Sequence, residues 1–370
     1  MALSTIGTNQ IEGEVFQANK NFVINGDFQC WQRTTAATAG VNNTLNTTDR
    51  FGWLLSNDGA VTSEQSTDTP TGTGYSFLLK CTTADTSLAA GQYAGLYHNI
   101  EAQNLQSLQY GSSSAKSITL SFFVKSNKTG TYTVAIYKSG NTGYIIPNEY
   151  TINSANTWEK KTITITSTAG GTSFITASAG ALLNTNALGF QVAFNLAFGS
   201  TFHGTNNTWS SNASHYSTSN AVNWMDSTSN NFYLSQVQLE IGDAATPFEH
   251  ESFEATLRKC QRYYYKISGA ANLDLGVGMC NTTTLAAINC PYAVPMRAKP
   301  TAVEQSGTAT HYDVLVDNSV VIANAVPVFQ RATTVSGTVG FQAASGLTAG
   351  EGTIMRTRND SGFLAWSAEL

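Results

Sequence analysis

Short segments that alternate hydrophobic and polar residues recur along most of the chain, and Gly, Asn and Ser separate them. In residues 161–166, for example, Ile163 and Ile165 share one face and threonines occupy the other. Such alternation predicts strands with one buried and one wet face. The clearest segments are residues 118–124, 131–137, 161–166, 188–196 and 232–239. Many short strands at regular spacing predict an all-β fold, a jelly-roll β-sandwich.

One segment, residues 252–265, has helical periodicity instead. Phe253, Leu257, Cys260 or Gln261, and Tyr264 recur every three to four residues and form one apolar stripe, with Ser252 or Thr246 as a candidate cap. Strand-like segments resume after this helix, at residues 273–279, 312–316, 338–342 and 363–370. The second β-region is shorter than the first.

These patterns predict four parts in the chain. They are an N-terminal docking arm over residues 1–19, a jelly-roll domain over 20–249, a linking helix over 250–266 and a smaller C-terminal β-domain over 267–370. Alternation within residues 5–16 indicates that the arm adds a strand to the sheet edge of a neighbouring chain.

The composition is typical of extracellular and viral β-proteins. Only 12% of the residues are charged, and Thr, Ser, Asn, Gly and Gln carry the surface polarity. The net charge is −5 and the Lys and Arg residues are scattered. A basic stripe is the electrostatic footprint of nucleic-acid binding. We therefore expect no nucleic-acid partner.

Five cysteines are present, at Cys30, Cys81, Cys260, Cys280 and Cys290. None forms a Cys-x-x-Cys motif or a Cys/His pair at zinc-ligand spacing. We expect buried, reduced thiols, with a Cys280–Cys290 bridge across a hairpin as the alternative.

The N-terminal sequence MALSTIGT has no basic segment and no apolar segment of a signal peptide. No stretch approaches the roughly 20 apolar residues that span a bilayer. We therefore expect no membrane insertion. Assembly in the cytoplasm of a host cell, followed by lysis, would bring such a surface-type protein outside.

Several motifs resemble one family. They are NFVINGDFQCWQR (residues 21–33), TDRFGW (48–53), YLSQVQLEIGDAATPFEH (233–250), CQRYY (260–264), VPMRAKPT (294–301) and the final SAEL (367–370). In this order they resemble phage tail-fibre and virion structural proteins with a carbohydrate-binding-module-like sandwich. The resemblance extends over most of the chain, from about residue 21 to residue 370.

The resemblance implies a galactose-binding-like jelly roll, a location in the virion and a homotrimer. Long fibres of this group have an extended attachment region before the sandwich, whereas only about twenty residues precede it here. The sequence therefore favours a short fibre or spike, attached to other virion proteins through its N-terminal arm.

Candidate carbohydrate-binding residues are Trp53, His203, Trp209, Tyr216 and Trp224. Trp209 lies in a loop rich in Ser, Asn and His, residues 199–223. Aromatic faces stack on sugar rings, and amide and hydroxyl groups satisfy sugar hydroxyls. The alternative is an ordered loop packed against a neighbouring subunit, an interpretation that the resemblance supports.

Asp27 and Asp49 are candidates for a structural calcium site, because carboxylate oxygens are the ligands that Ca²⁺ prefers. The ordinary interpretation of Asn25-Gly26, just before Asp27, is a tight turn. No other cofactor is expected.

No catalytic motif is present: the chain lacks Gly-x-Ser-x-Gly, a P-loop and His-Glu-x-x-His. Glu249, Glu251 and Glu254 are close in sequence, and two carboxylates can cleave a glycosidic bond, but Lys and Arg follow them. We expect ion pairs there and no enzyme. Three hypotheses follow: a homotrimeric virion fibre or spike that adheres to host glycans, a capsid or tail decoration or connector protein that binds no glycan, and a polysaccharide depolymerase.

Overall fold

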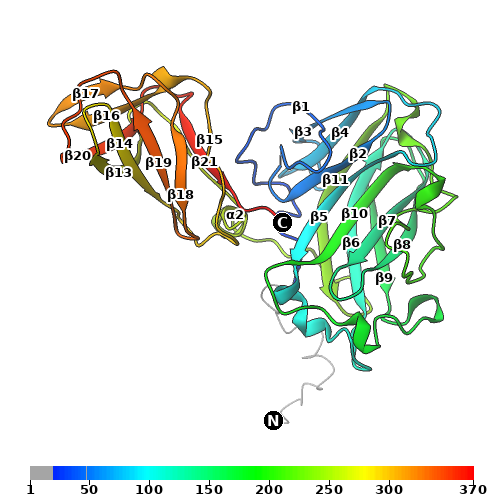
Figure 1. The fold of residues 1–370 in the computed structure, drawn as a ribbon. Helices are drawn as coiled ribbons and strands as arrows, with labels where there is room; N and C mark the ends of the chain where they lie inside the picture. The colour runs from blue at the N-terminus through cyan, green and yellow to red at the C-terminus, as the bar shows by residue number, and fades with distance from the viewer. Residues whose placement is uncertain (1–19, 47) are drawn as a thin grey trace, which may run out of the picture.

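Two β-sandwich lobes form the described chain, which comprises residues 20–46 and 48–370 of this computed structural model (Figure 1). The larger lobe precedes helix α2 (Phe253–Gln261) and the smaller lobe follows it. Each lobe has its own hydrophobic core. The expected all-β fold, a sandwich followed by a short helix and a smaller β-region, is confirmed. The docking arm expected over residues 1–19 lies outside the described residues.

The first sheet of the larger lobe has six antiparallel strands in the order β1-β3-β4-β11-β6-β9. They are β1 (Thr38–Ala39), β3 (Ala60–Ser66), β4 (Ser76–Thr83), β6 (Ile118–Ser126), β9 (Glu159–Ile165) and β11 (Asn231–Ile241). Alternation decides which side chains enter the core. In β9, Ile165 is fully buried, while the hydroxyl of Thr164 contacts that of Thr119 at 3.1 Å on the opposite face.

The second sheet of the larger lobe has five antiparallel strands in the order β2-β5-β10-β7-β8. They are β2 (Phe51–Ser56), β5 (Tyr93–Glu101), β7 (Gly130–Lys138), β8 (Tyr144–Ile152) and β10 (Leu188–Phe198). Alternate residues of β10, including Phe190, Val192 and Phe194, are fully buried in the core between the two sheets. Short 3-10 helices lie in the connections: η1 (Ala102–Leu108), η2 (Ala169–Gly171), η3 (Ser178–Gly180), η4 (Ser200–Phe202) and η5 (Trp224–Asp226).

The Asn25-Gly26 pair forms a tight turn, as the sequence predicts. Asn25 has a φ of 63°, which Asn tolerates better than most residues. A Cβ on Gly26 would lie 2.1 Å from the carbonyl oxygen of Val237, so only glycine fits. The turn thereby fixes the start of the larger lobe against β11.

Helix α2 begins after Ser252, whose Oγ accepts a hydrogen bond from the backbone N–H of Ala255 (3.3 Å). The helix turns Thr256 and Cys260 inward, and Phe253 is 54% exposed. The expected apolar stripe through Phe253 is therefore wrong. The helix is also shorter than residues 250–266, because the aromatic run that starts at Tyr263 favours a strand. No described helix is long and apolar enough to cross a bilayer.

The smaller lobe is a sandwich of a seven-stranded and a three-stranded sheet, in the orders β17-β16-β20-β13-β14-β19-β18 and β12-β21-β15. The strands of the larger sheet are β13 (Asp274–Cys280), β14 (Leu285–Pro291), β16 (Tyr312–Val316), β17 (Ser319–Ile322), β18 (Val328–Ala332), β19 (Ser336–Gln342) and β20 (Gly352–Thr357). Those of the smaller sheet are β12 (Tyr264–Ser268), β15 (Glu304–Gln305) and β21 (Phe363–Ser367), and η6 (Ala309–His311) precedes β16. Trp366, Phe341 and Tyr312 are fully buried between the sheets.

All five cysteines are buried and none is in a disulfide. The expected reduced thiols are therefore present. Cys280 pairs with Ala286 across the β13–β14 hairpin, so the register does not oppose it to Cys290.

Candidate functional site

The junction between the lobes is built around a buried carboxylate, Glu101, at the end of β5. Its side chain is fully buried and accepts hydrogen bonds from Arg262 (2.8 and 2.9 Å), the Tyr263 hydroxyl (2.6 Å) and Gln103 (2.6 Å). Burial alone would raise the pKa of Glu101, but the bonds from Arg262 and Tyr263 lower it. A carboxylate of the larger lobe thus stays ionised and binds the segment that follows α2.

Two arginines of the larger lobe stack on tyrosines of that same segment. The guanidinium carbon of Arg50 lies 3.5 Å from the ring centre of Tyr263, and that of Arg33 lies 3.6 Å from the ring centre of Tyr264. Both arginines form ion pairs with Glu369. The lobes are therefore joined by ion pairs and by the stacking of planar guanidinium groups on tyrosine rings.

The last residues of the chain return to the larger lobe (Figure 1). Asn99 donates to the main-chain oxygen of Leu370 (2.5 Å), and Arg297 donates to the carbonyl oxygens of Ala368 and Glu369 (2.8 and 2.7 Å). Contacts from residues 262–264, which follow α2, and from residues 369–370 thus fix the smaller lobe against the larger one.

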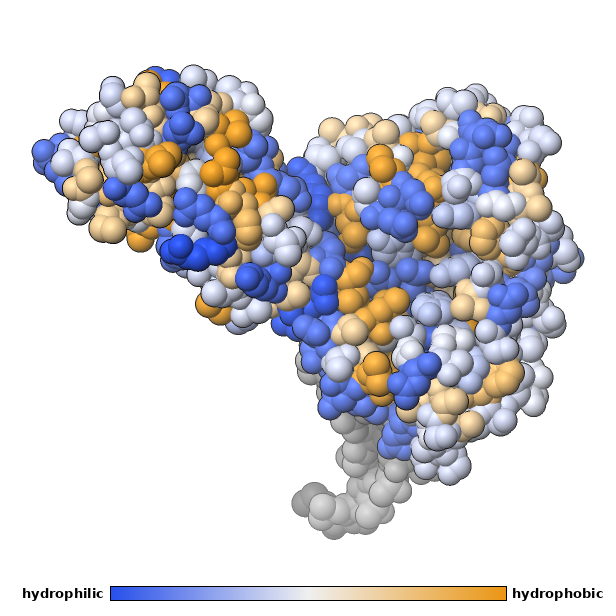
Figure 2. Space-filling model, viewed as in Figure 1, coloured by the Kyte–Doolittle hydropathy of each residue, from blue (hydrophilic) through white to orange (hydrophobic). Residues whose placement is uncertain are grey.

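An open cleft of about 530 Å³ lies beside this junction. We call it the interlobe cleft; it is lined by Arg33, Thr34, Asn43, Thr44, Leu45, Asn46, Tyr264, Lys266, Glu304, Phe363, Ser367 and Glu369. A second hollow of about 340 Å³ shares Glu304, Ser367 and Glu369 with it and adds Arg297 and Lys299. Figure 2 shows hydrophilic residues gathered where the two lobes meet.

The two hollows contain more basic than acidic side chains, although the chain as a whole is acidic. Arg33, Lys266, Arg297 and Lys299 line the two hollows together with Glu304 and Glu369, and Arg33 also pairs with the buried Asp49 (3.2 Å). Lys266 lies 4.5 Å from the ring centre of Phe363, and burial lowers its pKa. Its ammonium donates to the carbonyl oxygen of Arg33 (3.4 Å), and the charge of Glu304 opposes the lowering of its pKa. The cleft therefore offers a cation, an aromatic ring and amide groups to a ligand.

Three of the predicted sugar-stacking residues belong to the core. Trp53, Trp209 and Trp224 are 2%, 1% and 0% exposed. Their indole N–H groups donate to Asn46 Oδ1, the carbonyl of Thr166 and the carbonyl of Asn231, at 3.1–3.2 Å. Rings that are buried and satisfied in this way cannot stack on a sugar, so this assignment is wrong for all three.

His203 and Tyr216 remain partly exposed and lie near one another. His203 Nε2 is 3.0 Å from the carbonyl oxygen of Phe198, and the Tyr216 ring stacks on the Phe198 ring at 5.8 Å. The Tyr216 hydroxyl donates to Gln191 (2.9 Å). The structure thus brings together two of the five candidates, and their role in glycan binding stays a prediction.

The calcium candidates Asp27 and Asp49 do not share one ligand group. Asp27 accepts from Gln29 (3.0 Å). Asp49 is fully buried and accepts from Cys30 Sγ (3.0 Å) and the backbone N–H of Gln32 (3.0 Å). Around Asp49, the group of possible metal ligands found among the described residues contains two thiols and no second carboxylate, so it is not the oxygen set that calcium requires.

The three glutamates near α2 have ordinary partners. Glu251 pairs with Lys259, Glu254 pairs with Arg258 (3.3 Å), and Glu249 accepts from the backbone N–H of Asn21 (2.9 Å). Glu251 and Glu254 are thus ion-paired with basic residues that follow them, as expected.

Sequence reasoning missed an apolar surface on the smaller lobe. Val320, Leu315, Ile354 and Val277 are successive neighbours across β17, β16, β20 and β13 and face away from the core. A second row crosses β13, β14, β19 and β18. It consists of Met279, Ala287, Gly340 and Val328, in that order. We call this surface the apolar sheet face; it comprises Val277, Met279, Leu285, Leu315, Val320, Ile322, Val328 and Ile354.

Six side chains of the apolar sheet face are highly exposed. They are Val277 (59%), Met279 (52%), Leu285 (44%), Val320 (53%), Ile322 (40%) and Val328 (56%). Apolar residues are visible on the surface of this lobe in Figure 2. The missed signal was the run of consecutive apolar residues in β16 and β17, which places hydrophobic side chains on both faces of a sheet.

Comparison with known proteins does not identify a family, because no family model and no curated protein matches the chain. Solved structures do match in part. One is a putative sugar binding protein from Bacteroides thetaiotaomicron, with 13% identity and a TM-score of 0.32 over 60% of this chain and 100% of that one. Another is the enzymatically active domain of tailspike protein 4 of bacteriophage CBA120, with 13% identity and a TM-score of 0.28 over 60% of this chain and 22% of that one.

A third match is a family 11 carbohydrate-binding module from Clostridium thermocellum, with 13% identity and a TM-score of 0.27 over 59% of this chain and 99% of that one. At such identities and scores we draw no conclusion about function from these matches.

Proposed function

We propose that this protein is a non-enzymatic structural component of a phage virion, a short fibre or spike. It assembles with copies of itself through the apolar sheet face and holds host-surface glycans in the interlobe cleft. The apolar sheet face is the observation that carries the proposal. The N-terminal residues 1–19 would attach the assembly to other virion proteins, and the protein would be made in the host cytoplasm.

Self-association follows from the exposed hydrophobic side chains. Soluble monomers rarely expose large contiguous apolar patches, and such patches mark interaction sites. A stable interface buries roughly 800 Å² on each partner. A sheet face with a row of four aliphatic residues across β17, β16, β20 and β13 and a row of three across β13, β14 and β18 is suited to that task. Its occupant in this proposal is a second and third copy of the chain, as in a homotrimer.

Glycan binding in the interlobe cleft follows from its lining. Amides such as Asn43 match sugar hydroxyls, Phe363 offers a ring, and Lys266 lies beside that ring as a cation. The adjoining second hollow adds Arg297 and Lys299, and this excess of basic groups over the two hollows together favours glycans that bear carboxylates. Linked copies raise weak affinity by roughly 10²–10⁴.

Light scattering tests the assembly. We expect the wild type to have three times the mass of the 39.5 kDa chain at micromolar concentration. The double variant Val277→Glu/Val320→Glu should fall to the single-chain mass, because carboxylates would be buried without partners. The matched control Lys160→Glu, at an exposed position of β9, should keep the wild-type mass. A wild type that is a monomer would refute the assembly.

A glycan array on the assembled protein tests adhesion. We expect binding to acidic glycans that Lys266→Ala weakens at least tenfold and that Lys160→Ala leaves unchanged. If the assembled protein binds no glycan on the array, the adhesive function is refuted and a decoration or connector protein is the remaining interpretation. New reducing ends after incubation with host polysaccharide would instead establish a depolymerase and overturn the non-enzymatic assignment.

A further inference from the structure

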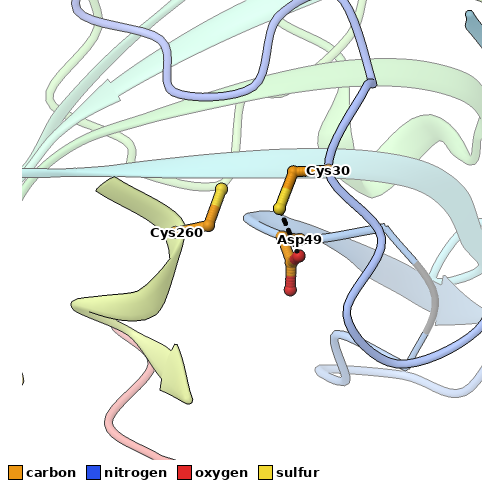
Figure 3. A group of neighbouring side chains, drawn as sticks. All are labelled: Cys30, Asp49 and Cys260. Carbon is orange, nitrogen blue, oxygen red and sulfur yellow. Dashed lines mark hydrogen bonds between the residues drawn. The ribbon is translucent and has the colours of Figure 1, made fainter. Parts of the chain in front are cut away.

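Three potential metal ligands meet at the contact between the larger lobe and α2. Cys30 Sγ, Cys260 Sγ and a carboxylate oxygen of Asp49 all lie within 4.8 Å of one another, and all three residues are fully buried (Figure 3). Cys30 and Asp49 belong to the larger lobe, on either side of the loop that precedes β2. Cys260 comes from the last turn of α2, 230 positions after Cys30 in the numbering.

We propose that Cys30, Asp49 and Cys260 form a binding site for a soft divalent cation such as zinc, which clamps the larger lobe to the linking helix. Two thiolates and one carboxylate are three of the four ligands that tetrahedral zinc takes in proteins. Thiolate ligands select zinc over calcium and magnesium, which prefer oxygen.

The surroundings hold the ligands in place. Asp49 accepts hydrogen bonds from the backbone N–H of Gln32 (3.0 Å) and from Arg33 (3.2 Å). The backbone N–H of Cys30 donates to Asn25 Oδ1 (2.9 Å), within the tight turn described above. Such outer hydrogen bonds orient ligating groups and are a regular part of metal sites. The site is therefore ordered from the larger-lobe side, and α2 supplies the remaining thiol.

The charge balance permits a cation in this buried place. Each thiol gives up its proton to solvent as its sulfur forms a bond to the metal, so one divalent cation replaces two protons and the local charge does not change. The charges nearby are balanced as well, because Arg33 pairs with Asp49 and Arg50 pairs with Glu369. No oxidant or reductant is needed.

Metal analysis of the purified protein under reducing conditions tests the site, with zinc and cobalt as the probes. We expect one bound ion per chain in the wild type and a thiolate-to-cobalt charge-transfer band after cobalt loading. Cys30→Ser and Cys260→Ser should bind at least tenfold more weakly. The matched control Cys290→Ser, a buried thiol in the core of the smaller lobe, should bind as the wild type does.

The wild type alone also decides the question if a junction variant fails to fold. We expect zinc to raise its unfolding temperature and a chelator to lower it again, with the same response in Cys290→Ser. No stoichiometric metal in the wild type would overturn the proposal. So would equal binding in all variants, or a mass spectrum in which Cys30 and Cys260 form a disulfide under these conditions.

Discussion

The outer face of the five-stranded sheet in the larger lobe is covered differently from the outer face of the seven-stranded sheet in the smaller lobe. In the larger lobe, Ala135, Ala193 and Ile145 lie on the outer face of the five-stranded sheet and are nevertheless fully buried. The loop over residues 199–223 contacts this face: Thr133 bonds to Ser217 (3.0 Å), and the Ser210 backbone pairs with Ile145. In the smaller lobe, the outer face of the seven-stranded sheet is the apolar sheet face. Among the described residues no loop covers it, and side chains such as Val277 and Val328 are exposed to solvent.

The larger lobe therefore covers its outer apolar side chains with its own chain, whereas the smaller lobe needs a second chain to cover them. The larger lobe shields its second apolar layer with its own loop, which forms hydrogen bonds to the sheet through Ser217 and the backbone of Ser210. The smaller lobe has aliphatic residues on both faces of one sheet and a three-stranded sheet on only one of them. The hydrophobic effect therefore favours covering the apolar sheet face with another chain.

The largest predicted effect concerns the loop cover of the larger lobe. Trp209→Ala should lower the free energy of unfolding by about 3–5 kcal/mol, because it removes a fully buried indole. Trp158→Ala, at a half-buried ring that donates to Asp68 (2.9 Å), should cost less than half as much. Denaturant unfolding measures both. A stable Trp209→Ala protein that has lost only glycan binding would restore the sugar-stacking role.

The next effect concerns the junction between the lobes. Glu101→Gln should cost about 3 kcal/mol, because it leaves Arg262 without its buried partner. Glu254→Gln, at an exposed pair in α2, should cost about 0.3–0.5 kcal/mol.

The pH dependence of Glu101 has a defined sign. Its folded pKa is lowered, so its contribution to stability is present above its ordinary pKa and is lost as the pH falls through the folded value. Acid should therefore destabilise the wild type more than Glu101→Gln. Equal acid sensitivity of the two proteins would contradict the buried ion pair.

Lys138 provides a further comparison of the two lobes. The larger lobe buries this charged side chain completely, whereas the smaller lobe leaves several valines exposed. Burial lowers the pKa of Lys138 from 10.5 to about 8. Between these values the unfolded chain binds the proton and the folded chain does not, so stability rises with pH. We expect the wild type to gain about 1–2 kcal/mol relative to Lys138→Met between about pH 7.5 and 9.5. A constant difference would refute the shift.

The smallest effect should come from the apolar sheet face of an isolated chain. At concentrations where single chains prevail, Val320→Thr should change the free energy of unfolding by less than about 0.5 kcal/mol, because Val320 is 53% exposed. Val314→Thr, in the adjacent strand but fully buried, should cost about 1–3 kcal/mol. Equal costs in denaturant unfolding would mean that the two faces are not distinct.

Local patterns were sufficient to predict the strands, the tight turn at Asn25-Gly26 and a helix near residue 253. They failed where long-range packing decides. Trp209 lies in a sequence of Ser and Asn that is typical of an exposed loop, yet the loop folds back and buries it. The approach of Cys30 to Cys260 depends on how α2 docks, which no local spacing encodes.

Thiol labelling of Val320→Cys tests the covered face most directly. All five native cysteines are buried, so an introduced surface cysteine is the reactive thiol. At micromolar concentration we predict that Val320→Cys reacts at least tenfold more slowly than Lys160→Cys, and that dilution to single chains removes the difference. Equal labelling rates at every concentration would show that the apolar sheet face stays open to solvent and would contradict the account.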